Sequence, residues 1–132
     1  MNNTDFKYSE LTGIIIGAAM EVHKILGNGF QEVIYQRALE EELKIRGIEY
    51  QREVTIKVYY KYIEVGDRRV DFLIAGKICV ELKAVKQLEK VHFAQAINYL
   101  EAFNLEVGLL INFGSTSLEF RRFENKKYKQ IV

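Results

Sequence analysis

The stretch RRVDFLIAGKICVELKAV, residues 68–85, predicts two β-strands joined by a turn at Gly76. Its apolar residues are interrupted by Asp71 before the turn and by Glu81 and Lys83 after it. Because side chains alternate along a strand with a period of two, Glu81 and Lys83 lie on the same face. Pairing through the turn brings Asp71 towards Glu81, although a slip of one residue would reverse its face.

The charged residues of this hairpin have two explanations. In the first, a solvated face of the sheet carries a cross-strand ion pair, which contributes roughly 0.2–1 kcal/mol. In the second, Asp71 and Glu81 are buried beside Lys83 and bind a cation, because clustered carboxylates are costly unless a positive charge lies between them. Mg²⁺ is the natural candidate, since it takes oxygen ligands and uses one or two carboxylates with water and substrate phosphate.

Upstream of the hairpin the hydrophobic pattern is helical. Apolar residues recur at i, i+3 and i+4 over residues 9–26, with Ser9 as the expected N-cap and Gly27 as the stop. A second helix is expected over about residues 31–46, ending at Gly47, where glycine can adopt the left-handed conformation. Two helices therefore precede the first strand.

The rest of the chain predicts five strands and a third helix. Residues 52–60 alternate apolar and polar side chains and form an antiparallel meander with the two hairpin strands. The expected strands cover residues 52–60, 62–74, 77–85, 106–114 and 117–124, and the expected helix covers residues 88–103. The order α-α-β-β-β-α-β-β predicts an α/β or α+β fold in which helices cover the sheet.

Composition indicates one ordinary globular domain over residues 1–132, with 48% hydrophobic and 28% charged residues. The net charge of +1 gives no overall attraction for nucleic acid, so any basic surface is local. Cys79 is the only cysteine, which excludes an internal disulfide and argues against a closed zinc site. Without a signal peptide or an apolar run that could span a bilayer, we expect a cytoplasmic protein with no membrane partner.

The helices contribute further polar residues on their inward sides. Glu32 falls on the same stripe of the second helix as Tyr35, although the helix dipole also favours a glutamate in the first turn. The third helix carries three polar residues along one edge of its apolar arc: His92, Gln95 and Tyr99. Packing at the core edge explains His92 better than metal ligation does.

Together these residues resemble the PD-(D/E)XK nuclease superfamily, in which a strand acid is followed by an acid-x-lysine motif on the next strand. Here the motif residues are Asp71 and Glu81-Leu82-Lys83. The chain is most similar to the GxxExxY branch, whose signature is present in GFQEVIY as Gly29, Glu32 and Tyr35. Further similar segments are EVHKILGNG, VDFLI, VELKAV, HFAQAINYL and GLLINFGS. The resemblance implies a restriction-endonuclease-like core with a central mixed sheet flanked by helices.

The resemblance also implies a Mg²⁺ site, in which Mn²⁺ can substitute. Asp71, Glu81 and the Leu82 carbonyl would bind the ion, with Glu32 completing the shell directly or through water. Lys83 would orient or deprotonate the attacking water and offset negative charge in the transition state. Gln95 would position water or a phosphate oxygen. The supporting residues would be Tyr35, Tyr99, His92 and Gly29.

The implied function is hydrolysis of DNA phosphodiester bonds with little sequence preference, because 132 residues leave no separate domain for reading base edges. A homodimer would make a double-strand break easiest, since each chain holds one site. Two alternatives stay open: a nucleic-acid-binding accessory module with little cleavage, and a structural partner with a buried ion-pair network. The sequence leaves open DNA versus RNA, strandedness, and endonuclease versus exonuclease action.

Overall fold

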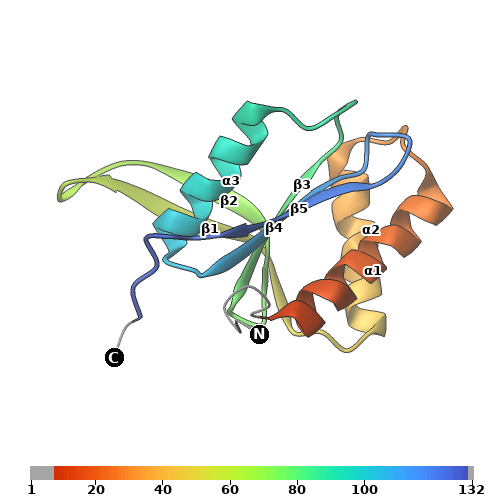
Figure 1. The fold of residues 1–132 in the computed structure, drawn as a ribbon, viewed down its shortest axis with the longest axis horizontal. Helices are drawn as coiled ribbons and strands as arrows, with labels where there is room; N and C mark the ends of the chain where they lie inside the picture. The colour runs from red at the N-terminus through yellow and green to blue at the C-terminus, as the bar shows by residue number, and fades with distance from the viewer. Residues whose placement is uncertain (1–7, 131–132) are drawn as a thin grey trace.

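The computed structural model describes residues 8–130 and forms a five-stranded sheet with helices on both faces (Figure 1). Its elements are the helices α1 (Ser9–Leu26), α2 (Glu32–Ile45) and α3 (Lys90–Phe103) and the strands β1 (Tyr50–Tyr60), β2 (Ile63–Ile74), β3 (Ile78–Lys83), β4 (Val107–Asn112) and β5 (Glu119–Glu124). This order confirms the predicted fold class. Within the described residues, no helix is long and apolar enough to cross a membrane.

The sheet is mixed, with the strand order β1-β2-β3-β4-β5. The first three strands form the expected antiparallel meander, and β5 pairs antiparallel with β4 at the far edge. The chain crosses from β3 to β4 through α3, and these two central strands run parallel. A parallel pair needs such a crossover, because a tight turn can join only antiparallel neighbours.

The turn between β2 and β3 sets the register of the hairpin. Ala75 and Gly76 have φ values of 53° and 64°, and the Lys77 N–H donates to the Ile74 carbonyl at 2.9 Å. Two central residues with positive φ are typical of a type I′ turn, whose twist matches that of paired strands. The resulting register places Phe72 opposite Val80.

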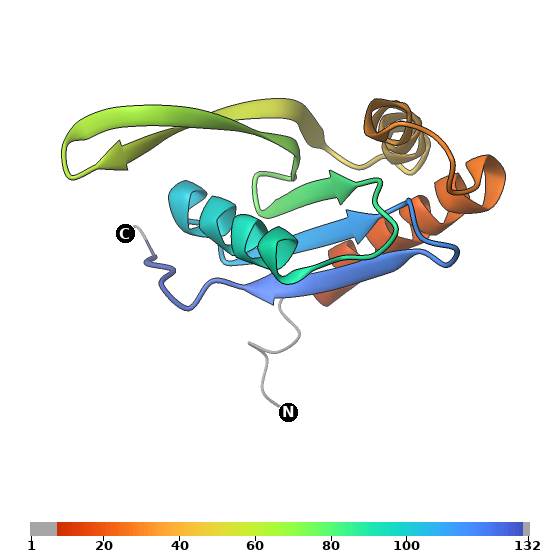
Figure 2. The ribbon, with the colours of Figure 1, turned by 90° about the horizontal axis from the view of Figure 1, so that it is seen from above.

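Two separate cores bury the sheet. Figure 1 and Figure 2 show α1 and α2 on one face of the sheet and α3 on the other. On one face, α1 and α2 pack against Phe72, Val80 and Leu82. On the other face, a smaller cluster joins Val70 and Cys79 of the sheet to Leu100 of α3. Because β3 is covered on both sides, Glu81 is only 7% exposed, and the solvated-face explanation of its charge is wrong.

The helix ends agree in part with the sequence. Gly27 and Gly47 have φ values of 75° and 68°, so both glycines end their helices as expected. The expected N-cap is wrong: the N-cap residue of α1 is Tyr8, and no side chain caps it. Ser9 is instead the first helical residue, and its carbonyl accepts a hydrogen bond from the Thr12 hydroxyl at 3.1 Å.

The carboxyl end of β3 is held by the fully buried Asn112. The Asn112 amide bonds the backbone N–H and carbonyl of Val85, each at 2.9 Å, and also bonds Glu119 and the Gly114 N–H. A Cβ at Gly114 would lie 2.4 Å from the Val85 backbone. The absence of a side chain at Gly114 therefore lets two loops close behind the strand that carries Lys83.

We predict that Gly114→Ala lowers the free energy of unfolding by about 1–3 kcal/mol, because the added methyl group meets backbone atoms that cannot rotate away. Urea denaturation measures the change. The matched control is Gly13→Ala in α1, where a Cβ meets nothing within 4 Å; helix propensity favours this alanine by about 1 kcal/mol. Equal effects of the two substitutions would contradict the close approach at Gly114.

Candidate active site

The candidate site forms where β2 and β3 separate. Phe72 and Val80 are the last paired residues before the site. Beyond them the Asp71 N–H donates to Glu81 Oε1 at 3.2 Å, and the Leu82 N–H donates to Asp71 Oδ2 at 2.8 Å. Each carboxylate thus accepts a hydrogen bond from a backbone N–H of the opposite strand. Such N–H groups need an acceptor when they are buried. The predicted approach of Asp71 to Glu81 is confirmed.

The backbone is irregular at Asp71 and at the residue opposite it on β1. Glu53, which lies opposite Asp71 between two paired positions of β1, has a φ of 56°, and positive φ is uncommon for residues other than glycine. Along β2, Val70 packs in the cluster on the α3 face, whereas Phe72 packs against α1 and α2. The regular alternation of side chains therefore breaks at Asp71, and strain of this kind gathers at functional sites.

Gln36 of α2 positions the Asp71 carboxylate. Its Nε2 donates to Asp71 Oδ1 at 2.7 Å, and its Oε1 accepts from Arg52 Nη1 at 3.2 Å. The Gln36 side chain is nearly buried, with 5% exposed. Sequence reasoning missed this residue, although it lies four positions after Glu32 and so shares its helical face.

Four charged side chains from three elements influence one another at this point. The pKa of Glu32 is raised by burial and then by the negative charge of Asp71. Burial also raises the pKa of Asp71, against the hydrogen bonds from Leu82 and Gln36. The positive charge of Lys83 opposes both shifts. The structure therefore brings Glu32 and Lys83 into the electrostatic neighbourhood of the paired acids.

Glu81 has the largest shift among these carboxyl groups. Burial raises its pKa to about 8, and the charge of Asp71 adds to the effect. The Asp71 N–H and the Lys83 ammonium oppose the rise without cancelling it. A proton or a cation at Glu81 thus relieves the repulsion between the two acids at neutral pH.

Tyr35 of α2 holds the loop that precedes this helix. Its hydroxyl donates to the Gly27 carbonyl at 2.6 Å and accepts from the Phe30 N–H at 3.1 Å, and its ring stacks on Phe113 with centroids 4.7 Å apart. These contacts fix the loop that contains Gly29 and leads into Glu32 at the start of α2. In the structure, Tyr35 therefore anchors the loop that contains Gly29, and this loop leads directly to the carboxyl group of Glu32.

The three polar residues of α3 have different surroundings. Burial raises the pKa of Tyr99 and the charge of Glu81 raises it further, which places the phenol close to the acids. Gln95 is exposed and lines a groove between α3 and the β1–β2 hairpin together with Tyr99. His92 lies at the helix start, where its Nδ1 accepts the Glu89 N–H at 2.9 Å in a capping box.

A family model of the PD-(D/E)XK nuclease superfamily matches residues 9–123. The chain belongs to the PD-(D/E)XK nuclease superfamily. Nucleases of this superfamily generally use divalent metal ions. No curated protein sequence matches the chain significantly.

A solved structure of similar fold supports the architecture of this PD-(D/E)XK chain. The crystal structure of SSO0001 superposes with a TM-score of 0.59 at 19% sequence identity. The alignment covers 93% of this chain and 62% of that protein, so this chain spans less than two thirds of the length of SSO0001. At this identity the likeness concerns the fold alone.

The donor set of the PD-(D/E)XK site is that of a hard cation. Among residues 8–130, no three His, Cys, Asp or Glu side chains are grouped closely enough to form a complete metal cage. Asp71 and Glu81 nevertheless present carboxylate oxygens side by side, and Mg²⁺ is commonly held by one or two carboxylates with water. The raised pKa of Glu81 gives an independent reason for a cation at this position.

We predict that Gln36→Leu lowers the free energy of unfolding of this PD-(D/E)XK protein by about 1–3 kcal/mol, because Asp71 loses a donor and Arg52 loses an acceptor in a buried region. Thermal and urea unfolding measure the effect. Gln95→Leu, at an exposed position on α3, is the matched control and should change stability by less than about 0.5 kcal/mol. Equal losses would mean that the Gln36 bridge contributes nothing.

Glu81 also predicts a pH dependence of stability in EDTA. Because its pKa rises from 4.5 in the unfolded chain to about 8 in the fold, the folded state holds the proton more tightly. Its contribution is complete below about pH 4.5 and is lost as the pH rises to 8. Glu81→Gln should remove this loss, which amounts to several kcal/mol at about 1.4 kcal/mol per pKa unit.

Urea unfolding from pH 4 to pH 9 tests this pH dependence. Glu81→Gln can still accept the Asp71 N–H through its amide oxygen, so the variant isolates the charge. Glu10→Gln, on the exposed first turn of α1, controls for removal of any carboxylate. Parallel stability curves for wild type and Glu81→Gln would show that Glu81 titrates in the fold as it does in the unfolded chain.

Proposed function

We propose that this protein is a Mg²⁺-dependent nuclease that hydrolyses phosphodiester bonds of DNA with little sequence preference. The observation that carries the proposal is the interlocked pair of Asp71 and Glu81 beside Lys83, in a chain of the PD-(D/E)XK nuclease superfamily. The spacing of Gly29, Glu32 and Tyr35 supports assignment to the GxxExxY branch.

Asp71, Glu81 and the Leu82 carbonyl are the residues that would hold the ion, with Glu32 reaching it directly or through water. A bound Mg²⁺ supplies Lewis-acid stabilisation of the charge that develops on the phosphate. The hydrogen bonds from Gln36 and Leu82 hold the Asp71 carboxylate in a fixed orientation. This orientation is set before substrate arrives, which avoids reorganisation during the reaction.

Lys83 has the role of orienting or deprotonating the attacking water. Its positive charge opposes the rise in the pKa of Glu32, Asp71 and Glu81. This shared effect supports a position of the ammonium group between the carboxylates and the substrate. As a cation it also offsets the negative charge of the transition state. Gln95 and Tyr99 border the site from α3 and would contact water or phosphate oxygens.

The proposal of low sequence preference rests on the architecture of the described residues. The described residues form one sheet with three helices and no additional module for inserting side chains into a groove of DNA. A homodimer would place two sites on opposite strands.

We predict that the purified protein degrades or nicks DNA with Mg²⁺ or Mn²⁺, that EDTA stops the reaction, and that Lys83→Ala lowers the rate at least 100-fold, a typical loss when a positioned proton-transfer group is removed. Asp71→Asn should cost several powers of ten. A plasmid-nicking assay with quantified single-turnover rates measures both effects.

Lys24→Ala, at an exposed position of α1, is the control and should cleave as the wild type does. Circular dichroism establishes that each variant is folded. Equal cleavage by wild type and Lys83→Ala would identify a contaminating nuclease and reject the proposal. Binding of DNA without turnover, weakening steeply with salt, would identify the accessory-module alternative.

A further inference from the structure

The outer part of the β1–β2 hairpin projects beyond the sheet. β3 pairs only with Phe72, Leu73 and Ile74 of β2, so residues 55–69 continue as a two-stranded ribbon (Figure 2). We refer to residues 55–69 as the ribbon. An isolated pair of strands is marginally stable in water, so a ribbon of this length is expected to serve a contact with another molecule.

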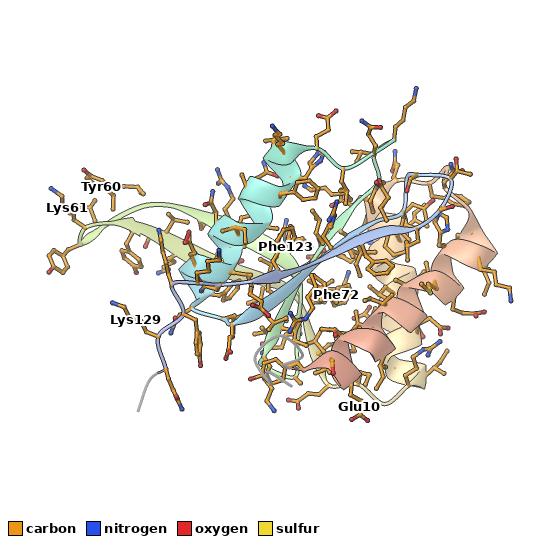
Figure 3. The ribbon with its side chains drawn as sticks, in the orientation of Figure 1. Glu10, Tyr60, Lys61, Phe72, Phe123 and Lys129 are labelled. Atoms are coloured by element: carbon orange, nitrogen blue, oxygen red, sulfur yellow. The ribbon has the colours of Figure 1, made fainter. Side chains whose placement is uncertain are left out.

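The free end of the ribbon exposes large apolar side chains. They include Tyr59, Tyr60, Tyr62, Ile63 and Val65, and Tyr62 is 97% exposed. Figure 3 shows Tyr60 and Lys61 at this end, far from the rest of the protein. The Lys61 Nζ lies 5.6 Å from the centre of the Tyr60 ring. Exposed apolar groups that gather in one segment mark an interaction site.

A groove of about 540 Å³ runs between the ribbon and α3. The ribbon contributes Val58 and Arg68 to its lining, and α3 contributes Asn98 and Tyr99. Arg68 donates one N–H to the Asp67 carbonyl and forms no ion pair within the described part of the chain. The groove therefore combines apolar surface, amide and hydroxyl groups, and an available guanidinium.

Arg68 and Tyr99 connect the groove to the region of the paired acids. Arg68 precedes Asp71 by three residues on β2, which corresponds to roughly 10 Å along a strand. Tyr99 lines the groove and is also close enough to Glu81 for that charge to affect its phenol. A molecule that fills the groove from the ribbon inward thus reaches the site of hydrolysis.

We propose that the ribbon and α3 bind an unpaired polynucleotide strand, so that the substrate contains a single-stranded segment. This inference rests on the proposed function. Tyrosines stack on the faces of unpaired bases, which a duplex hides, and stacking of this kind tolerates any sequence. Lys61 and Arg68 pair with phosphates along the same path. The strand enters at the exposed tyrosines and leads its backbone to Asp71.

The charges of the ribbon favour a single strand over a duplex. Two of its cations are already paired, Lys57 with Glu64 at 3.5 Å and Arg69 with Glu53 at 3.3 Å. The net charge of the whole chain is only +1. A broad basic surface, on which binding to the duplex backbone depends, is therefore missing from this face. A second copy of the chain is disfavoured as occupant, because Gln95 and Tyr99, which border the proposed active site, also line the groove.

Fluorescence anisotropy in EDTA tests the proposal without cleavage. The probes are a labelled oligothymidylate, an oligouridylate of equal length and a duplex of equal length. We expect the wild type to bind one or both single strands at least tenfold more tightly than the duplex. Tyr60→Ala and Tyr62→Ala should each weaken single-strand binding by roughly five- to thirtyfold, as loss of base stacking does.

The matched control is Tyr128→Ala, at a partly exposed tyrosine near the carboxyl end, which should bind as the wild type does. Thermal unfolding establishes that the variants are folded. Equal affinity for duplex and single strands, or unchanged affinity of both ribbon variants, would overturn the inference. Sedimentation provides a further arm: a wild-type dimer that Tyr62→Ala converts to a monomer with unchanged affinity assigns the ribbon to a second copy and also overturns it.

Failure of this inference is distinguishable from failure of the proposed function. Ribbon-dependent binding with no cleavage by the wild type would reject the nuclease but leave the strand-binding ribbon standing. Cleavage that requires Lys83 but is equal for the wild type and Tyr60→Ala, on single-stranded and duplex substrates alike, would retain the nuclease and reject the ribbon. The oligouridylate arm decides whether the unpaired strand is DNA, RNA or either.

Discussion

Asp71 and Glu81 each accept a backbone hydrogen bond from the strand that carries the other acid or its neighbour. At the end of the β2–β3 ladder these carboxylates replace the backbone carbonyls that a continuous ladder would provide. The two hydrogen bonds therefore stabilise the contact between the strands and also fix the position of both carboxylates. Neither carboxylate can change position without exposing a buried N–H group, so the site is rigid because the sheet requires it.

This arrangement combines a structural gain with an electrostatic cost. The hydrogen bonds satisfy buried donors, whereas burial raises the pKa of both acids and the charge of Asp71 raises the pKa of Glu81 further. Lys83 and the Gln36–Arg52 bridge compensate in part. Part of the negative charge of the two carboxylates remains uncompensated. A divalent cation compensates this charge more fully than a proton does, because it interacts with both carboxylates together.

The hairpin could be predicted from sequence because its information is local. The period of two, the Gly76 turn and the motif predict the strands and the meeting of Asp71 with Glu81, but they do not predict the break in alternation at Asp71. Gln36 could not be found in this way, since its contact depends on how α2 packs across the sheet. The exposure of Gln95 likewise follows from the rotation of α3, which apolar periodicity leaves uncertain by about one residue. The capping contact of His92 depends on the φ and ψ values of Glu89, which the pattern of apolar residues does not encode.

The two turns that end β2 have different constraints on their length. The length of the Ala75–Gly76 turn sets which residue of β2 lies opposite Glu81. One inserted residue would therefore shift Asp71 out of register and turn its side chain to the opposite face. The turn at Lys61 and Tyr62 joins strands whose outer ends pair with nothing else in the described chain. Homologous proteins can therefore lengthen or shorten the hairpin at this outer end without altering their chemistry. The length of the inner turn is constrained because it sets the position of Asp71 relative to Glu81.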